Sequence, residues 1–171
     1  MIYSRQERRY ATMKQKELSL WIRGIALVGA IAVLLLAAVI LPFVTADVLT
    51  AYPLQRALIF LCAGIAAVMV LPVLGVALLA WLIGTEIGRD NSFCMENARR
   101  LRLACILALT DTLLCLILTL MLAFGGLLHP GILLLLAGLM GLGIACAVVF
   151  AALSHLTRKA AELQGENDLT I

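Results

Sequence analysis

The residue of this sequence best suited to chemistry is Asp111, which lies in the otherwise uncharged run 103–128 between two threonines, Thr110 and Thr112. Carboxylates inside long apolar helices are rare, because the ionised group loses its hydration there. Such a group can hold a proton or an ion, or it can accept a hydrogen bond that locks two helices together. The sequence therefore predicts an intramembrane polar site at these three residues and leaves a structural role and a transport or sensing role open.

A second group of candidate residues precedes that run, in the segment 93–102. Met95, Ala98 and Leu101 recur at helical spacing, and the arginines fall off that stripe, which predicts a short amphipathic helix. Guanidinium groups on such a helix can bind lipid phosphates, and the same surface can dock a protein. The candidate docking residues of this segment and of the C-terminal tail are Phe93, Glu96, Asn97, Arg99, Arg100, Arg102, Asp168 and Leu169.

The other reactive residue types form no catalytic or metal-binding pattern. Five Cys residues without a CxxC spacing predict neither a disulfide framework nor a zinc site, and the two His residues are isolated. The sequence contains no Gly-rich phosphate loop, HExxH or GxSxG motif. We therefore expect no enzymatic activity, no metal and no cofactor.

The elements that must position these residues are four long apolar runs. The chain is 64% hydrophobic with a mean hydropathy of +1.09, far above the roughly 45–50% apolar content of soluble domains. A helix of about 20 residues crosses the hydrocarbon core of a bilayer. The sequence thus predicts an all-α polytopic membrane protein, a single membrane domain over 1–171 that forms a four-transmembrane-helix bundle. Its helices are expected at about 22–44, 57–85, 103–126 and 132–155.

The basic residues predict the orientation of this domain. All thirteen Lys and Arg residues except Arg56 fall in or directly beside the leader 1–21, the loop 86–102 and the tail 156–171. Short loops rich in Lys and Arg stay in the cytoplasm. We therefore expect all three segments, and both termini, on the cytoplasmic side.

Small residues four positions apart in the run 132–155 can let helix backbones approach closely. Packing within the monomer and a homo-oligomer seam are both open. One line includes Ala137, Gly141 and Ala145, and the other Gly143, Ala147 and Ala151; the candidate packing residues are Gly141, Ala145, Gly143 and Ala147.

Three features together resemble a bacterial membrane family known as domain of unknown function 2975 (DUF2975): the segment 93–102, Asp111 and the acidic ending 161–171. Where relatives have Ser after the Phe as a helix N-cap, this chain has Cys94, a weaker cap. The resemblance implies four membrane helices, a place in the bacterial plasma (inner) membrane and no catalytic residues. It also implies a partnership with a small cytoplasmic helix-turn-helix regulator, because members are often encoded beside one.

These observations favour a non-enzymatic regulatory or scaffolding partner of a cytoplasmic protein, embedded in the lipid bilayer. The alternatives are a small transporter or channel component that uses Asp111, and an accessory subunit of a larger membrane complex. A net charge of only +3 gives no reason to expect direct nucleic-acid binding.

Overall fold

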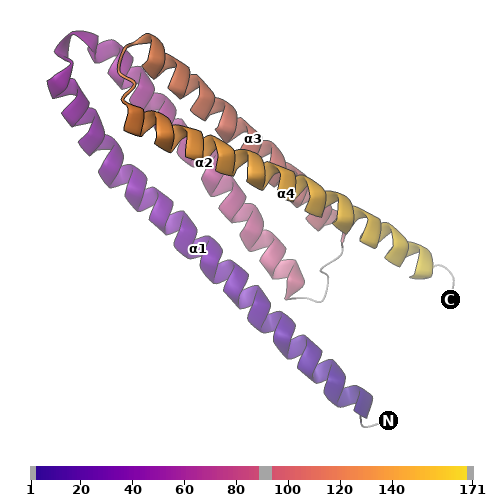
Figure 1. The fold of residues 1–171 in the computed structure, drawn as a ribbon. Helices are drawn as coiled ribbons and strands as arrows, with labels where there is room; N and C mark the ends of the chain where they lie inside the picture. The colour runs from indigo at the N-terminus through magenta and orange to yellow at the C-terminus, as the bar shows by residue number, and fades with distance from the viewer. Residues whose placement is uncertain (1–2, 89–93, 169–171) are drawn as a thin grey trace.

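The computed structural model describes the backbone of residues 3–88 and 94–168 and the side chains of residues 16–88 and 94–164. It consists of four long helices and one 3₁₀ turn (Figure 1). The long helices are α1 (Tyr3–Ala51), α2 (Arg56–Ile87), α3 (Met95–Phe124) and α4 (Pro130–Asp168), and the turn η1 (Pro53–Gln55) joins the first two. All four are long and apolar enough to cross a membrane, which confirms the predicted all-α, four-span architecture.

Helix α1 is longer at both ends than the predicted range 22–44. The leader lacks glycine and proline and is rich in Arg, Lys, Glu and Gln, which are good helix formers, so the helix continues through it. Pro42 lies within the helix, as membrane helices tolerate. Consequently Tyr52 and the three residues of η1 are the entire connection to α2.

Residues 94–102 do not form a separate amphipathic helix before α3, contrary to the prediction. Residues 95–102 form the first turns of α3 itself, because no glycine or proline interrupts the chain between Met95 and Phe124. Cys94 precedes the helix in an extended conformation and makes no side-chain capping bond. The helix ends at Gly125, and Gly126 follows with a φ of +67°, a conformation that glycine adopts without strain.

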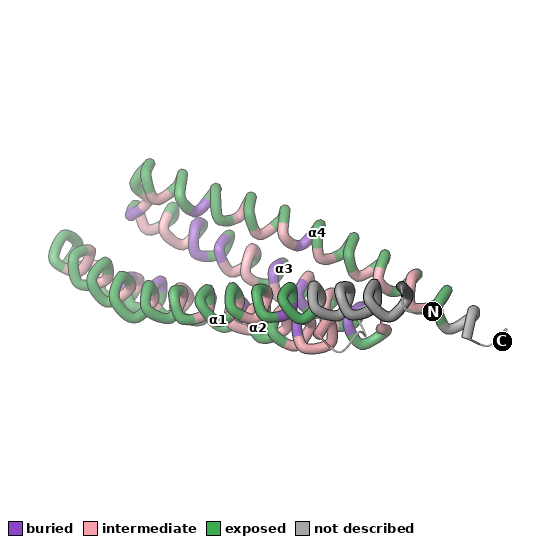
Figure 2. Tube along the Cα trace, turned by 90° about the horizontal axis from the view of Figure 1, so that it is seen from below, coloured by how far each residue is buried: buried purple, intermediate pink, exposed green. Residues whose placement is uncertain are grey.

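The four helices pack in a row and do not close into the predicted bundle. Within the described residues, α1 contacts α2, α2 contacts α3 and α3 contacts α4, whereas α1 and α4 are not neighbours (Figures 1 and 2). Of residues 16–51 of α1, only Ser19 is buried. The physical reason is that lipid tails solvate the apolar face of α1 as well as a contact with α4 would.

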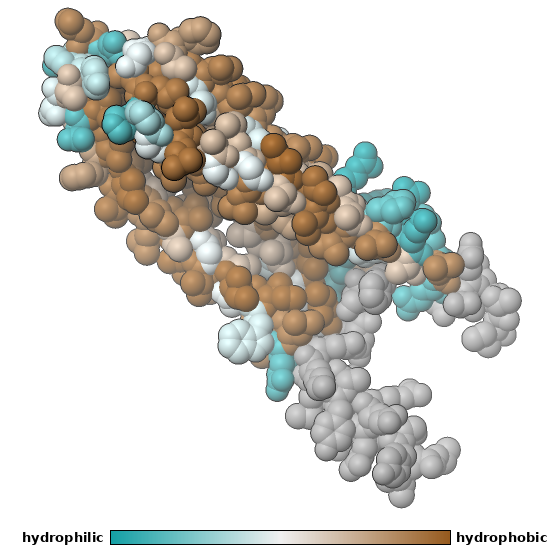
Figure 3. All heavy atoms as spheres, viewed as in Figure 1, coloured by the Kyte–Doolittle hydropathy of each residue, from teal (hydrophilic) through white to brown (hydrophobic). Residues whose placement is uncertain are grey.

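The buried core lies between α2, α3 and α4. Its centre is formed by Cys62, Cys115, Leu118 and Leu136, and Cys115 is only 2% exposed. Apolar side chains cover the middle of the visible surface, and hydrophilic ones gather at its two ends (Figure 3). This distribution matches an apolar belt between two polar membrane surfaces.

Only one of the two lines of small residues on α4 faces a neighbouring helix. Ala147 is buried, and a Cβ atom added at Gly143 would collide with the Thr112 side chain of α3. Gly141 and Ala145 are exposed, and a Cβ atom at Gly141 would meet nothing within 4 Å. Helix α4 therefore packs on α3 through the line that contains Gly143.

We expect Gly143→Val to lower the free energy of unfolding by about 1–3 kcal/mol, because the added atoms overpack the α3–α4 contact. Gly141→Val is the matched control, since it makes the same change on the same helix in open space. Unfolding of both variants in detergent micelles, followed by circular dichroism, measures the difference. Equal losses in the two variants would contradict this packing.

Candidate functional site

Most polar side chains of the described chain gather at one end of the row of helices, where α1 and α3 begin and α2 and α4 end (Figure 1). We call this end the terminal end. It comprises residues 16–23 of α1, 82–88 of α2, 94–102 of α3 and 154–164 of α4. Among the described Lys, Arg, Asp and Glu residues outside it, Asp47 and Arg56 lie at the opposite end and Asp111 lies within α3.

Arg100 joins α3 to the end of α2. Its Nη1 donates hydrogen bonds to the carbonyl oxygen of Leu82 at 3.3 Å and to Oδ1 of Asn97 at 3.2 Å. Its guanidinium also lies 3.9 Å from the carboxylate of Glu86 and 4.0 Å from that of Glu96. A cation near the C-terminus of α2 interacts favourably with the helix dipole, so the contact stabilises the α2–α3 pair.

Ser19 joins α1 to α2 in a similar way. Its buried hydroxyl donates to the carbonyl oxygen of Gly84 at 2.6 Å. A Cβ atom at Gly88 would lie 2.9 Å from Ser19 Oγ, so the absence of a side chain allows the close approach. On the next turn of α1, the Arg23 guanidinium lies over the Trp81 ring, 5.7 Å from its centroid, a cation–π contact.

Ser154 completes the series by joining α4 to α3. Its hydroxyl donates to the carbonyl oxygen of Ala98 at 2.8 Å. Each neighbouring pair of helices is thus held at the terminal end by one side chain, Ser19, Arg100 or Ser154, that donates to a backbone carbonyl of the next helix. The two serines lie outside the candidate residues predicted from sequence, although Gly84 and Gly88, four residues apart, signal a close helix contact.

The predicted docking residues separate into two groups. Asn97 is 1% exposed and Arg100 is bonded within the protein, so both serve helix packing. Glu96, Arg99 and Arg102 are exposed on α3. Phe93 and Leu169 lie outside the described residues, and Asp168 ends α4 with a side chain that also lies outside them.

Asp111 and its neighbouring threonines do not form a hydrogen-bonded cluster. Thr110 Oγ1 donates to the carbonyl oxygen of Ile106 at 2.9 Å, and Thr112 Oγ1 donates to that of Ala108 at 2.8 Å. Oδ1 of Asp111 is buried and has no hydrogen-bond partner among the described residues. The structure therefore places an unsatisfied carboxylate oxygen inside an apolar span.

No metal centre is formed by the part of the chain that the structure describes. Within it, no three His, Cys, Asp or Glu side chains lie close enough together to hold an ion.

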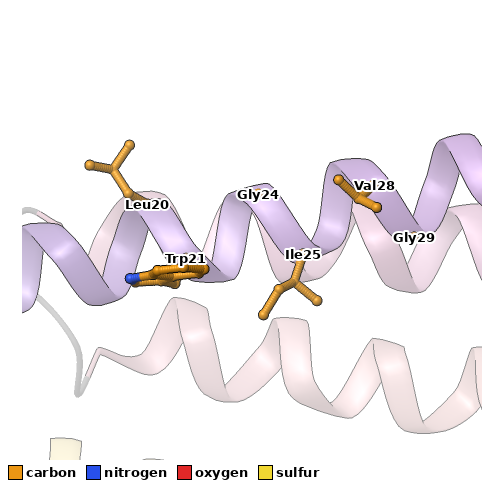
Figure 4. A pocket seen from close by; sticks show the side chains of 6 residues that line it. All are labelled: Leu20, Trp21, Gly24, Ile25, Val28 and Gly29. Carbon is orange, nitrogen blue, oxygen red and sulfur yellow. The ribbon is translucent and has the colours of Figure 1, made fainter.

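An open hollow of about 590 Å³ follows α1 near its terminal end, and Figure 4 shows Trp21 and Ile25 projecting from the same side of the helix. Residues of α1 alone form its lining, which is almost entirely apolar. Such a surface suits lipid tails and offers no group for catalysis. The lining residues are Leu20, Trp21, Gly24, Ile25, Val28 and Gly29.

Comparison with known proteins shows similarity to one family of uncharacterised proteins. The profile described as "Protein of unknown function (DUF2975)" matches residues 44–171, which include α2, α3 and α4 in full. No curated protein and no solved structure is significantly similar to the chain.

Replacing Arg100 by Gln should lower the free energy of unfolding by about 1–3 kcal/mol, because the Leu82 carbonyl and the Asn97 side chain lose a charged donor. Arg99 is the adjacent residue and its side chain is exposed. Arg99→Gln removes the same charge and should change the free energy of unfolding by less than about 0.5 kcal/mol. Denaturant titration in micelles compares the two. A loss in Arg99→Gln as large as in Arg100→Gln would show that general charge, and not this contact, stabilises the terminal end.

Proposed function

Because the chain belongs to the family described as "Protein of unknown function (DUF2975)", we propose that it is a non-enzymatic membrane protein whose terminal end binds a cytoplasmic regulatory protein. The proposed partner is of the helix-turn-helix type, as the family resemblance implies. The chain would act as a scaffold or regulator that holds this partner at the bacterial inner membrane. Four helices that are long and apolar enough to cross a membrane support this proposal.

The proposed orientation places the terminal end in the cytoplasm. Arg99, Arg100, Arg102, Arg158 and Lys159 all lie there, whereas Arg56 is the only described basic residue at the opposite end. Positively charged segments next to membrane helices are retained on the cytoplasmic side. Both termini and the α2–α3 connection would then face the same compartment as the partner.

The observation that carries the proposal is the length of α1 and α4. At about 1.5 Å per residue, their 49 and 39 residues span roughly 74 and 58 Å, against about 30 Å for the hydrocarbon core. The opposite end has only short connections, η1 with Tyr52 and residues 125–129, so the excess length lies at the terminal end. Two helices therefore extend beyond the membrane on one side and offer a surface to a soluble protein.

The extension of α4 has the composition of a protein contact. Leu163 is 62% exposed beyond the apolar span, beside the exposed ion pair of Arg158 and Glu162 at 2.8 Å. A leucine exposed on a helix can serve as an anchor for a partner helix or groove. The exposed side chains of Glu96, Arg99 and Arg102 on α3 supply further polar groups at the same end.

We expect the full chain, purified in a mild detergent from native membranes, to retain a helix-turn-helix protein that mass spectrometry identifies. With that protein purified, Leu163→Glu should weaken binding at least about tenfold, since burying one leucine contributes about 1.5–3 kcal/mol. Arg56→Gln at the opposite end is the control and should leave the affinity unchanged.

Two results would end this proposal. One is a purified chain that retains no cytoplasmic protein. The other is labelling by a membrane-impermeant thiol reagent that places the termini on opposite faces of the membrane, in chains whose five native cysteines are replaced and that carry one added cysteine at either terminus.

A second candidate function, a small transporter or channel component, is favoured by the buried Oδ1 of Asp111 alone. An unpaired carboxyl group in an apolar span is a recurrent part of proton and ion pathways.

If Asp111 carries such transport, Asp111→Asn should abolish proton or sodium flux into proteoliposomes, because the amide cannot exchange a proton. Thr110→Val, which alters an exposed neighbour bonded only to its own helix, should leave the flux intact. Fluorescent pH and sodium indicators inside the vesicles measure both. Equal flux in the Asp111→Asn variant and the unaltered chain would exclude this function.

A further inference from the structure

An open cavity of about 650 Å³ lies between α3 and α4 at the terminal end. Four nitrogen-bearing side chains line its polar part: Arg99 and Arg102 from α3, and His155 and Arg158 from α4. No acidic residue lines it among the described part of the chain. The cavity therefore presents a concentration of positive charge to any molecule that enters it.

Two of these arginines make no hydrogen bond or ion pair among the described residues. Arg99 and Arg102 lie three residues apart on one face of α3 and are exposed, and no acceptor among the described residues bonds to either. Arg100 differs, because it is bonded to α2 and does not line the cavity. Arg158 keeps one contact, with Glu162, which does not line the cavity either. The guanidinium groups of Arg99 and Arg102 are thus available to an external anion.

The deeper wall of the cavity is apolar. It is formed by Cys105 and Ile106 on α3 and by Ala151 on α4. Towards the middle of the membrane span, the same face of α3 continues at helical spacing with exposed Leu109 and Leu113, and that of α4 with exposed Val148 and Ile144. These exposed apolar side chains of α3 and α4 therefore form a track, a continuous apolar surface that runs from the basic side chains into the apolar belt.

We propose that this cavity binds an anionic phospholipid. The phosphate-bearing headgroup lies between Arg99, Arg102, His155 and Arg158, and the acyl chains lie along the apolar faces of α3 and α4. Basic pockets between membrane helices at the cytoplasmic surface are suited to such headgroups, because guanidinium forks match phosphate oxygens. The apolar continuation distinguishes a lipid from a free phosphate ion, which would leave that track unused.

The test uses the full chain, purified and delipidated in detergent, with fluorescent phosphatidylglycerol and phosphatidylcholine as probes. Phosphatidylglycerol should bind at least about tenfold more tightly than phosphatidylcholine, and Arg99→Gln/Arg102→Gln should remove about tenfold or more of that affinity. Lys16→Gln/Lys159→Gln removes the same charge from exposed residues outside the cavity and should change binding by less than about twofold. Equal losses in the two double variants would show a general surface-charge effect and overturn the proposal.

Two further measurements separate a lipid from a free anion. Inorganic phosphate at millimolar concentration should not displace phosphatidylglycerol, and displacement would overturn the lipid assignment. Ala151→Trp fills the apolar wall without changing charge and should lower phosphatidylglycerol binding as much as the loss of the two arginines. Unchanged binding in an Ala151→Trp chain that elutes as a single folded species would also overturn it. These outcomes are independent of whether a cytoplasmic protein binds to the extension of α4.

Discussion

The arrangement of the four helices depends on side chains that donate hydrogen bonds to backbone carbonyls of the next helix. Apolar burial gives little preference for one neighbour over another in a bilayer, because lipid tails are as apolar as leucine. Ser19, Arg100 and Ser154 supply that preference at the terminal end, one for each neighbouring pair. Their acceptors, the carbonyl groups of Gly84, Leu82 and Ala98, are backbone atoms, so these contacts depend on helix position more than on the acceptor's side chain.

The four helices form an open row, so its two outer helices each have a face that no other helix of the described chain covers. Within the described residues, α1 packs on α2 alone and α4 on α3 alone, so both outer helices present long apolar faces to lipid or to another membrane protein. Asp111 lies on α3, one of the two inner helices of this row, and its Oδ1 is buried without a hydrogen-bond partner among the described residues.

The first turns of α3 perform two tasks with adjacent residues. Arg100 bonds to Leu82 of α2 and to the buried Asn97, whereas Arg99 and Arg102 are exposed. Helical geometry separates the two sets, because residues three or four apart share a face and adjacent residues do not. The same segment can therefore fix the helix row and present charge to lipid headgroups or a protein. The N-terminal part of α1 and the C-terminal part of α4 lie at the same end, where the proposed protein and lipid contacts are located.

The sequence by itself determined the number of membrane helices and the end at which basic residues gather, since apolar length and charge position are local properties of the chain. Only the tertiary structure decided which surfaces meet. The two small-residue lines of α4 have the same spacing, yet Gly143 and Ala147 pack on α3 while Gly141 and Ala145 do not. Thr110 and Thr112 are adjacent to Asp111 in sequence, yet both hydroxyl groups bond to their own helix. The packing of one small-residue line and the bond from Ser19 to Gly84 depend on segments distant in the chain, and local periodicity carries no information about them.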